Sequence, residues 1–232
     1  MKPLQKPSYL SSFGRNRGRS LSDRQQALVD DLLPRISVEI DAQGKAILPE
    51  NYAHRILEIG FGGGEHLVAL AQHKPESLLI GCEPFINGVA KALCAIEECV
   101  IQNIRLFSDD ARILMAALPE KSVEEAYILF PDPWPKLRHN KRRLVNQETL
   151  SMLARIQPQG ASLLIATDHH DYATWILEQL YQTPYFDWKP QHPKDWHNPP
   201  SHWVQTKYER KTSEQGRAPM FFACTRTEIA HK

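Results

Sequence analysis

Residues 130–143 combine an acid, an aromatic ring and a run of cations directly after an apolar segment. Prolines at positions 131, 133 and 135 prevent both a helix and a sheet ladder, and each pushes the residue before it, Phe130, Asp132 or Trp134, towards extended geometry. We therefore expect Asp132 and Trp134 on a stiff, exposed strip at the end of a buried strand, at the edge where an open α/β sheet binds ligands. Five Lys or Arg residues within 136–143 could contact phosphates. A proline-rich turn followed by a solvated basic face would carry the same charges.

A glycine-rich turn at 58–64 separates an apolar strand at 55–59 from a helix at 65–73. Its glycines, Gly60, Gly62 and Gly64, allow positive φ and a close approach of the backbone to a ligand. Glu65 stands where a dinucleotide fingerprint has Gly or Ala, and the acid Glu58 would repel a pyrophosphate, so the pattern argues against NAD. Glu58 would suit a ligand that carries an ammonium and a sulfonium, as S-adenosylmethionine does. Taken alone, it could equally be a surface residue.

Two more acids follow the next two expected strands. Glu83 comes after the strand at 78–82, where an acid can accept hydrogen bonds from both hydroxyls of a ribose. Asp110 comes after the strand at 104–107 and could accept from an adenine amine, or could simply cap the next helix together with Asp109. Three acids at three successive strand ends favour S-adenosylmethionine over their separate structural explanations.

Strands and helices alternate along the chain, which predicts a parallel, doubly wound sheet. Segment 184–202 contains five prolines and is expected to be irregular, and 204–209 and 220–225 are expected to form a closing antiparallel pair. The remaining expected strands lie at 123–130 and 161–166, and the expected helices lie at 24–33, 65–73, 84–100, 111–118, 145–156 and 171–181.

Positive charge is concentrated in two places although the net charge is only +1. Residues 1–24 hold six Lys or Arg residues against Asp23 alone, and the second cluster is 136–143. Such localised charge suits a polyanionic partner. We expect residues 1–20 to be a flexible basic arm, followed by one domain over 21–232.

The rest of the composition indicates a cytoplasmic protein. No apolar run approaches the roughly 20 residues of a membrane span, and the N-terminus lacks the apolar core of a signal peptide. The four cysteines form no CxxC pair, so neither a disulfide framework nor a zinc site is predicted. His192, His197 and His202 recur every fifth residue, but prolines interrupt the segment, and we predict no metal.

Six motifs follow one another in an order that resembles the bacterial tRNA (guanine-N7)-methyltransferase family over roughly residues 12–225. The glycine motif is common to many methyltransferases, whereas the Pro-Asp-Pro-Trp basic stretch is specific. The motifs are Glu58-Ile59-Gly60-Phe61-Gly62-x-Gly64, Gly81-x-Glu83, Asp110-Ala111, Phe130-Pro131-Asp132-Pro133-Trp134-x-Lys136-x-Arg138-His139-x-Lys141-Arg142-Arg143, Thr167-Asp168 and Thr206-Lys207-x-Glu209.

The resemblance implies a Rossmann-like class I methyltransferase fold, with a mostly parallel seven-stranded sheet, helices on both faces and an antiparallel C-terminal strand pair. It also implies transfer of a methyl group from S-adenosylmethionine to N7 of a variable-loop guanine in tRNA, as in a tRNA (guanine(46)-N7)-methyltransferase. The implied cofactor contacts are Glu58, Gly60, Gly62, Gly64, Glu83, Asp110 and Asp132. The implied substrate contacts are Lys136, Asp168, Thr206, Lys207, Tyr208 and Glu209, and the implied RNA contacts are Arg138, His139, Asn140, Lys141, Arg142 and Arg143.

The chemistry of the target suggests how such an enzyme would work. Guanine N7 carries a lone pair and no proton, so no base is needed and orientation can supply much of the catalysis. We expect Asp132 to be the catalytic residue, because a carboxylate would stabilise the positive charge that arrives on the purine. Trp134 could stack on the base or could equally cover the core.

Three alternatives stay open. The chain could methylate a protein or a small molecule, although a small substrate does not need the basic clusters. It could be an RNA-binding protein without activity, or an NAD-dependent oxidoreductase, although the glycine turn argues against both. We expect a monomer without an obligate protein partner.

Overall fold

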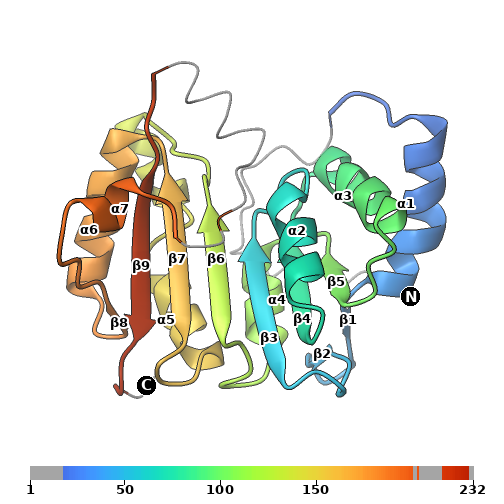
Figure 1. Cartoon of the computed structure of the whole chain (residues 1–232), viewed down its shortest axis with the longest axis horizontal. Coiled ribbons are helices and arrows are strands. Elements are labelled where there is room, and N and C mark those ends of the chain that lie inside the picture. The colour runs from blue at the N-terminus through green and yellow to red at the C-terminus, as the bar shows by residue number, and fades with distance from the viewer. Residues whose placement is uncertain (1–17, 201–202, 204–215, 230–232) are drawn as a thin grey trace.

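The protein folds around one seven-stranded sheet in a computed structural model. The structure describes residues 18–200, 203 and 216–229. The strand order is β5-β4-β3-β6-β7-β9-β8 (Figure 1). Strands β3 to β7 are parallel, and β9 runs antiparallel to both β7 and β8. The strands are β3 (His54–Ile59), β4 (Ser77–Cys82), β5 (Ile104–Phe107), β6 (Glu125–Leu129), β7 (Ser162–Thr167), β8 (Phe186–Asp187) and β9 (Met220–Arg226). This confirms the predicted seven-stranded, mostly parallel sheet with an antiparallel C-terminal pair.

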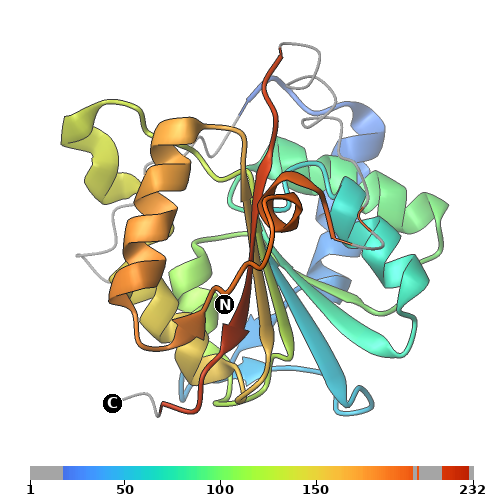
Figure 2. The ribbon, with the colours of Figure 1, turned by 60° about the vertical axis from the view of Figure 1, so that its left-hand side comes forward.

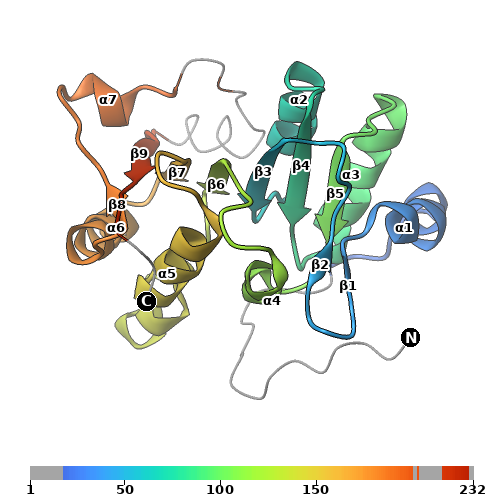
Figure 3. The ribbon, with the colours of Figure 1, turned by 90° about the horizontal axis from the view of Figure 1, so that it is seen from below.

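Helices cover both faces of this sheet (Figure 3). On one face lie α2 (Glu65–His73) and α3 (Ile86–Glu98), with α1 (Asp23–Ile36) packed on α3; on the other lie α4 (Ala111–Ala117), α5 (Gln147–Ile156) and α6 (His170–Gln182). Figure 2 shows the two layers on either side of the strands. Two short elements complete the described helices, the 3-10 helix η1 (Leu137–Arg142) and α7 (Lys194–His197).

Each face of the sheet has its own hydrophobic core, because successive side chains of a strand point to opposite faces. In β3, Ile56 joins the core under α1, α2 and α3, whereas Leu57 joins the core under α4, α5 and α6. Every residue of β4 is buried, as expected for a strand covered on both faces.

Local sequence signals account for the starts of α1 and α5. Ser22 and Gln25 form the reciprocal capping box that begins α1, and Asn146 caps α5. The expected end of the first helix at Pro34 is wrong, since α1 continues to Ile36 with Pro34 inside it. Proline removes one hydrogen bond, but in the last turn the packing of Leu33 in the core can offset that loss.

The segment expected to be irregular contains the two-residue strand β8 and the single-turn helix α7. A further small hairpin joins β1 (Glu39–Ile40) to β2 (Ala46–Ile47) before the main sheet. The expected strand at 204–209 lies outside the described residues, so β9 is placed by β7 and β8 alone.

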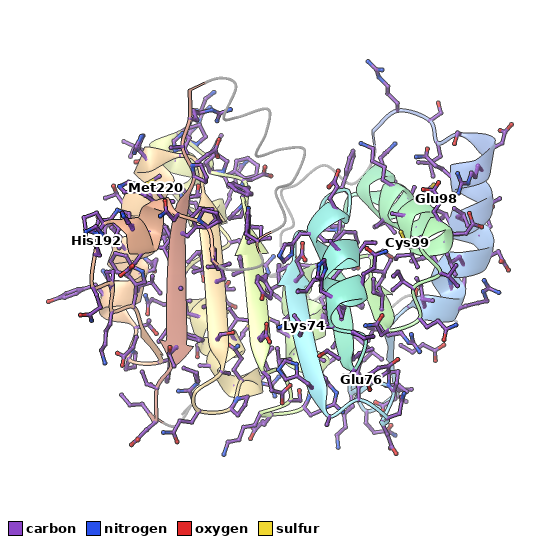
Figure 4. The ribbon with its side chains drawn as sticks, viewed as in Figure 1. Lys74, Glu76, Glu98, Cys99, His192 and Met220 are labelled. Atoms are coloured by element: carbon purple, nitrogen blue, oxygen red, sulfur yellow. The ribbon has the colours of Figure 1, made fainter. Side chains whose placement is uncertain are left out.

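The strand order reverses between β3 and β6, which marks a topological switch point. The parallel strands end at the upper edge of Figure 1. Figure 4 places Met220, which pairs with the last residue of β7, towards that edge, and Lys74 and Glu76, which precede β4, towards the opposite one. Ligands of open α/β sheets bind outside the carboxyl edge at such a point, so we expect the functional site at this edge. None of the described helices has both the length and the apolarity to span a membrane.

Candidate functional site at the carboxyl edge

The turn between β3 and α2 has a backbone that only glycine adopts readily. Gly60, Gly62 and Gly64 have φ of 77°, 55° and 81°. A Cβ on Gly64 would come within 2.6 Å of Ala92 on α3, so that glycine serves close packing. A Cβ on Gly60 or Gly62 would meet nothing within 4 Å. The turn therefore presents open backbone at the edge, as a cradle for a ligand requires.

Glu83, directly after β4, is joined to this turn. Its two carboxylate oxygens accept hydrogen bonds from the backbone N–H groups of Gly62 and Phe85, each at 2.9 Å. Burial raises the pKa of Glu83, the two backbone hydrogen bonds oppose that rise, and the negative charges of Asp132 and Glu58 add to it. Glu58 lies near the end of β3, Glu83 follows β4 and Asp132 follows β6, so the pairing of these neighbouring parallel strands brings three of the predicted acids to the switch point.

Glu58 is buried rather than a surface residue, with a relative exposure of 2%. Its Oε2 lies 2.8 Å from Nδ1 of His66, which is itself buried in the first turn of α2. The rings of Tyr127 and Trp203 lie 5.0 and 5.3 Å from the His66 ring. The sequence prediction missed His66, and its one signal was a polar residue on the buried face of a helix.

Asp110 is the N-cap of α4, which was the structural alternative to a ligand role. Its Oδ1 accepts from the backbone N–H and the Nε of Arg112, each at 3.0 Å, and its Oδ2 accepts from Nη2 at 2.7 Å. Asp110 is buried. The carboxylate is thus fixed in place beside the edge, and contact with an adenine remains a prediction.

The strip after β6 is strained rather than extended at the positions before two of its prolines. Phe130 and Trp134 have φ of 50° and 43°, so their predicted extended geometry is wrong. The steric rule for residues before proline disfavours the right-handed helical region and leaves other conformations open. The Phe130 N–H still donates to Ala166 O at 2.8 Å, which continues the ladder one residue beyond β6. Asp132 is exposed at the edge, and a positive φ at a bulky residue costs energy that the surroundings must offset.

The basic stretch forms η1, with Lys136, Arg138 and Lys141 exposed. Arg142 lies 5.1 Å from the centre of the Trp134 ring, and His139 contacts the same ring edge-on at 5.9 Å. Partial desolvation, and then the charges of the neighbouring cations, lower the pKa of His139. Trp134 is half-buried against its own basic stretch.

Arg143 departs from the expectation that it contacts RNA. It is 2% exposed, its Nε donates to the carbonyl of Pro133 at 2.9 Å, and its guanidinium pairs with Asp171. A buried guanidinium with these partners does not face a phosphate in solvent. The sequence prediction for this residue is therefore corrected, because one linear run of cations contains both exposed members and one internal member.

Asp168 lies at the same edge, directly after β7. It is 6% exposed, and its Oδ2 lies 2.8 Å from Nη1 of Arg217. The sequence prediction did not include Arg217. The other predicted substrate contacts, Thr206, Lys207, Tyr208 and Glu209, lie outside the described residues. Figure 4 shows His192 at the outer side of the molecule near α7, and no group of three potential metal ligands occurs among the described residues.

Known proteins resemble this chain in sequence and in fold. A family model described as "Putative methyltransferase" matches residues 53–222. A tRNA (guanine-N(7)-)-methyltransferase from Caulobacter vibrioides (strain NA1000 / CB15N) is 44% identical over 225 residues, which cover 97% of this chain and 98% of that protein. Among solved structures, the 16S rRNA methyltransferase KamB is similar with a TM-score of 0.55 and 16% identity, covering 82% of this chain and 95% of that one. A Haemonchus contortus phosphoethanolamine N-methyltransferase in complex with S-adenosyl-L-methionine is similar with a TM-score of 0.50 and 15% identity. The match covers 78% of this chain and 50% of that one.

Proposed function

This chain belongs to the tRNA (guanine-N(7)-)-methyltransferase family, and from that premise we propose that it methylates N7 of a guanine in tRNA with S-adenosylmethionine as the methyl donor. We propose that the target is guanine 46 of the variable loop. The observation that carries the proposal is the convergence of Glu58, Glu83 and Asp132 beside an open glycine turn at the switch point.

The residues at the edge fit the cofactor group by group. The open backbone at Gly60 and Gly62 leaves room for a ligand where a side chain would fill it. We assign Glu83 to the ribose hydroxyls and Glu58 to the ammonium, and Asp110 to the adenine amine. Acids suit this ligand because it carries an ammonium and a sulfonium, whereas they would repel a pyrophosphate.

When bound, S-adenosylmethionine supplies a methyl group on a positively charged sulfur. Guanine N7 has its lone pair in the ring plane and no proton to lose, so the protein needs no general base. Its main task is alignment of the two reactants, for which effective molarities of about 10⁵ M or more are known. The purine becomes positively charged during the transfer, and Asp132 at the exposed edge would stabilise that charge.

The RNA would lie across the basic stretch. Lys136, Arg138 and Lys141 are exposed on or beside η1, next to the strip that carries Asp132. We assign these cations to phosphate contacts and Trp134 to stacking on the target base. Asp168, with Thr206 to Glu209, is assigned to the opposite side of the base pocket.

The test uses labelled S-adenosylmethionine and two unmodified tRNA transcripts, identical except for guanine or adenine at variable-loop position 46. We expect 7-methylguanosine from the first transcript and only background from the second. Equal labelling of both transcripts would overturn the position, and absence of 7-methylguanosine from the guanine-46 transcript as well would overturn the activity. Light scattering and cell fractionation would test the predicted monomer and its cytoplasmic location.

A further inference from the structure

Arg143 is the one cation of the 136–143 stretch that is buried, and it holds the backbone of the strip that presents Asp132. Its Nε donates to the carbonyl of Pro133 at 2.9 Å, which is the residue directly after Asp132 and before Trp134. The rest of the guanidinium points towards α6, where it pairs with Asp171. One side chain therefore ties the strip to a helix of the main domain.

The guanidinium is enclosed by aromatic rings that are themselves fixed. Its central carbon lies 5.2 Å from the ring centres of both Tyr172 and Trp175. Trp175 donates to Val145 O at 2.7 Å, and the Tyr172 hydroxyl accepts from Val145 N at 3.2 Å. These contacts, together with the Asp171 pair, hold the guanidinium while its Nε donates to the Pro133 carbonyl.

The strip needs such a contact because its backbone is strained on both sides of Pro133. Phe130 and Trp134 have positive φ, which bulky residues keep only where surrounding contacts over-determine the conformation. The ladder bond from Phe130 N to Ala166 O holds one end. Near the other end, the Arg143 hydrogen bond to the Pro133 carbonyl joins the strip to the main domain.

We propose that Arg143 is a positioning residue that fixes Asp132 and Trp134 through the Pro133 carbonyl and makes no contact with RNA. This rests on the proposed function for its effect on methylation, although the bracing itself does not. A lysine cannot replace it, since a single ammonium lacks the planar fork that reaches a carbonyl on one side and a carboxylate on the other.

The two roles for Arg143 predict different behaviour of Arg143→Lys and Arg143→Gln. If Arg143 bound a phosphate, Lys would largely restore tRNA affinity, and Gln would make the slope of log affinity against log salt shallower by about 0.7–0.9. If it braces the strip, both variants slow single-turnover methylation by about 10- to 100-fold at saturating tRNA and S-adenosylmethionine, as a small misplacement of reacting groups does. The salt slope stays that of the wild type. Lys141→Gln is the positive control, because Lys141 is an exposed cation of the same stretch. It is expected to make the slope of log affinity against log salt shallower, as the loss of a phosphate contact does.

Arg226 supplies a matched control for general loss of stability. It is also buried, and its Nε donates to a backbone carbonyl, that of Ala154, at 3.0 Å. It lies at the end of β9 opposite the site, beside the start of β7. Arg226→Gln is expected to lower the melting temperature without slowing single turnover below that temperature. If Arg226→Gln slows the reaction as much as Arg143→Gln, the bracing role is overturned.

Hydrogen exchange gives a readout that needs no substrate. Arg143→Gln is expected to accelerate exchange of the Phe130 amide, which donates to Ala166 O at the start of the strip, in the ligand-free protein, while Arg226→Gln leaves it unchanged. Unchanged exchange in Arg143→Gln would overturn the proposal even if methylation fell. Accelerated exchange in a protein whose wild type does not methylate tRNA would support the brace and refute the proposed function separately. Should Arg143→Gln not fold, Asp171→Asn removes the exposed carboxylate that anchors the Arg143 guanidinium on α6, and it is expected to act in the same direction with a smaller effect.

Discussion

Glu83→Gln is a specific test of the cofactor site, because the hydrogen bonds of Glu83 in the structure define which contacts the substitution removes. Each carboxylate oxygen of Glu83 already accepts one backbone N–H, from Gly62 or Phe85. A carboxylate has about four acceptor positions, so the two that remain can face the two hydroxyls of a ribose. Gln has nearly the same size, but it replaces one oxygen by an amide NH2 that would face a backbone donor. The variant loses the negative charge and at least one acceptor.

The expected loss of cofactor affinity follows from the type of bond removed. A hydrogen bond to a charged group contributes about 1.5–3 kcal/mol. Its loss corresponds to roughly a 10- to 100-fold larger dissociation constant for S-adenosylmethionine. Folding stability should change less, since the loss of one backbone hydrogen bond is partly offset by relief of the buried charge near Asp132 and Glu58. Glu83→Ala is the harsher variant, because it leaves the N–H groups of both Gly62 and Phe85 without this acceptor.

The pH dependence provides a second signature. Burial raises the pKa of Glu83 in the folded protein above its value in the unfolded chain, so the folded state binds the proton more tightly. Ionisation of Glu83 therefore destabilises the fold as pH rises through the folded pKa, and this penalty is absent below the unfolded pKa. Cofactor binding has the opposite dependence, since only the carboxylate accepts from both hydroxyls.

Calorimetric titration with S-adenosylmethionine, and thermal unfolding over the same pH range, measure both effects. Wild-type affinity should fall on acidification through the raised pKa, and the affinity of Glu83→Gln should lack that component. Unchanged affinity in Glu83→Gln at neutral pH would refute the ribose assignment. An equal pH dependence in both proteins would show that another group controls binding.

Three further predictions concern the same edge and the start of the chain. Asp132→Asn should fold and bind tRNA but slow single turnover at saturating S-adenosylmethionine by about 10²–10³, by analogy with one lost oxyanion-hole donor; a near-normal rate would mean that alignment alone carries the transfer. His66→Phe keeps a ring but removes the hydrogen bond to Glu58, and should weaken S-adenosylmethionine binding in calorimetry; unchanged affinity would show that Glu58 is held without it. Deleting residues 1–19 removes the backbone groups that form two hydrogen bonds of 2.7 Å with the Asn87 amide. The deletion should nevertheless leave the melting temperature nearly unchanged and reduce tRNA turnover. A large fall in melting temperature would contradict the prediction that the arm is a peripheral segment.

The sequence predicts those parts of the fold that are set by local patterns. The expected helix at 65–73 has the same bounds as α2, because a glycine turn precedes it and Pro75 follows closely after its end. The strand at 104–107 likewise agrees with β5. Glu83 and Glu58 could be assigned to the edge because the carboxyl ends of parallel strands meet there.

Tertiary contacts decide what the sequence does not predict. Nothing local distinguishes Arg143 from Arg142, since the burial of Arg143 depends on rings that α6 brings to it from about thirty positions later in the chain. The contact between Glu58 and His66 depends on how α2 is rotated about its axis relative to β3, and the sequence pattern does not specify that rotation. Positive φ at Phe130 and Trp134 opposes intrinsic preference, and such residues occur where tertiary structure stores strain at a site.

The acidic edge also bears on the direction of the proposed reaction. Burial first, and then the negative charges of Asp132 and Glu58, raise the pKa of Glu83, and a ligand with extra positive charge beside these acids opposes that rise. S-adenosylmethionine carries a sulfonium that its demethylated product lacks, so the edge should favour the methyl donor over the product. In the proposed reaction, the methylated guanine carries the transferred positive charge and would meet the same Asp132 that we propose stabilises its formation. Release of the modified base must then be supported by the rest of the tRNA leaving the basic stretch, which makes product release, unlike the chemical step, strongly dependent on salt.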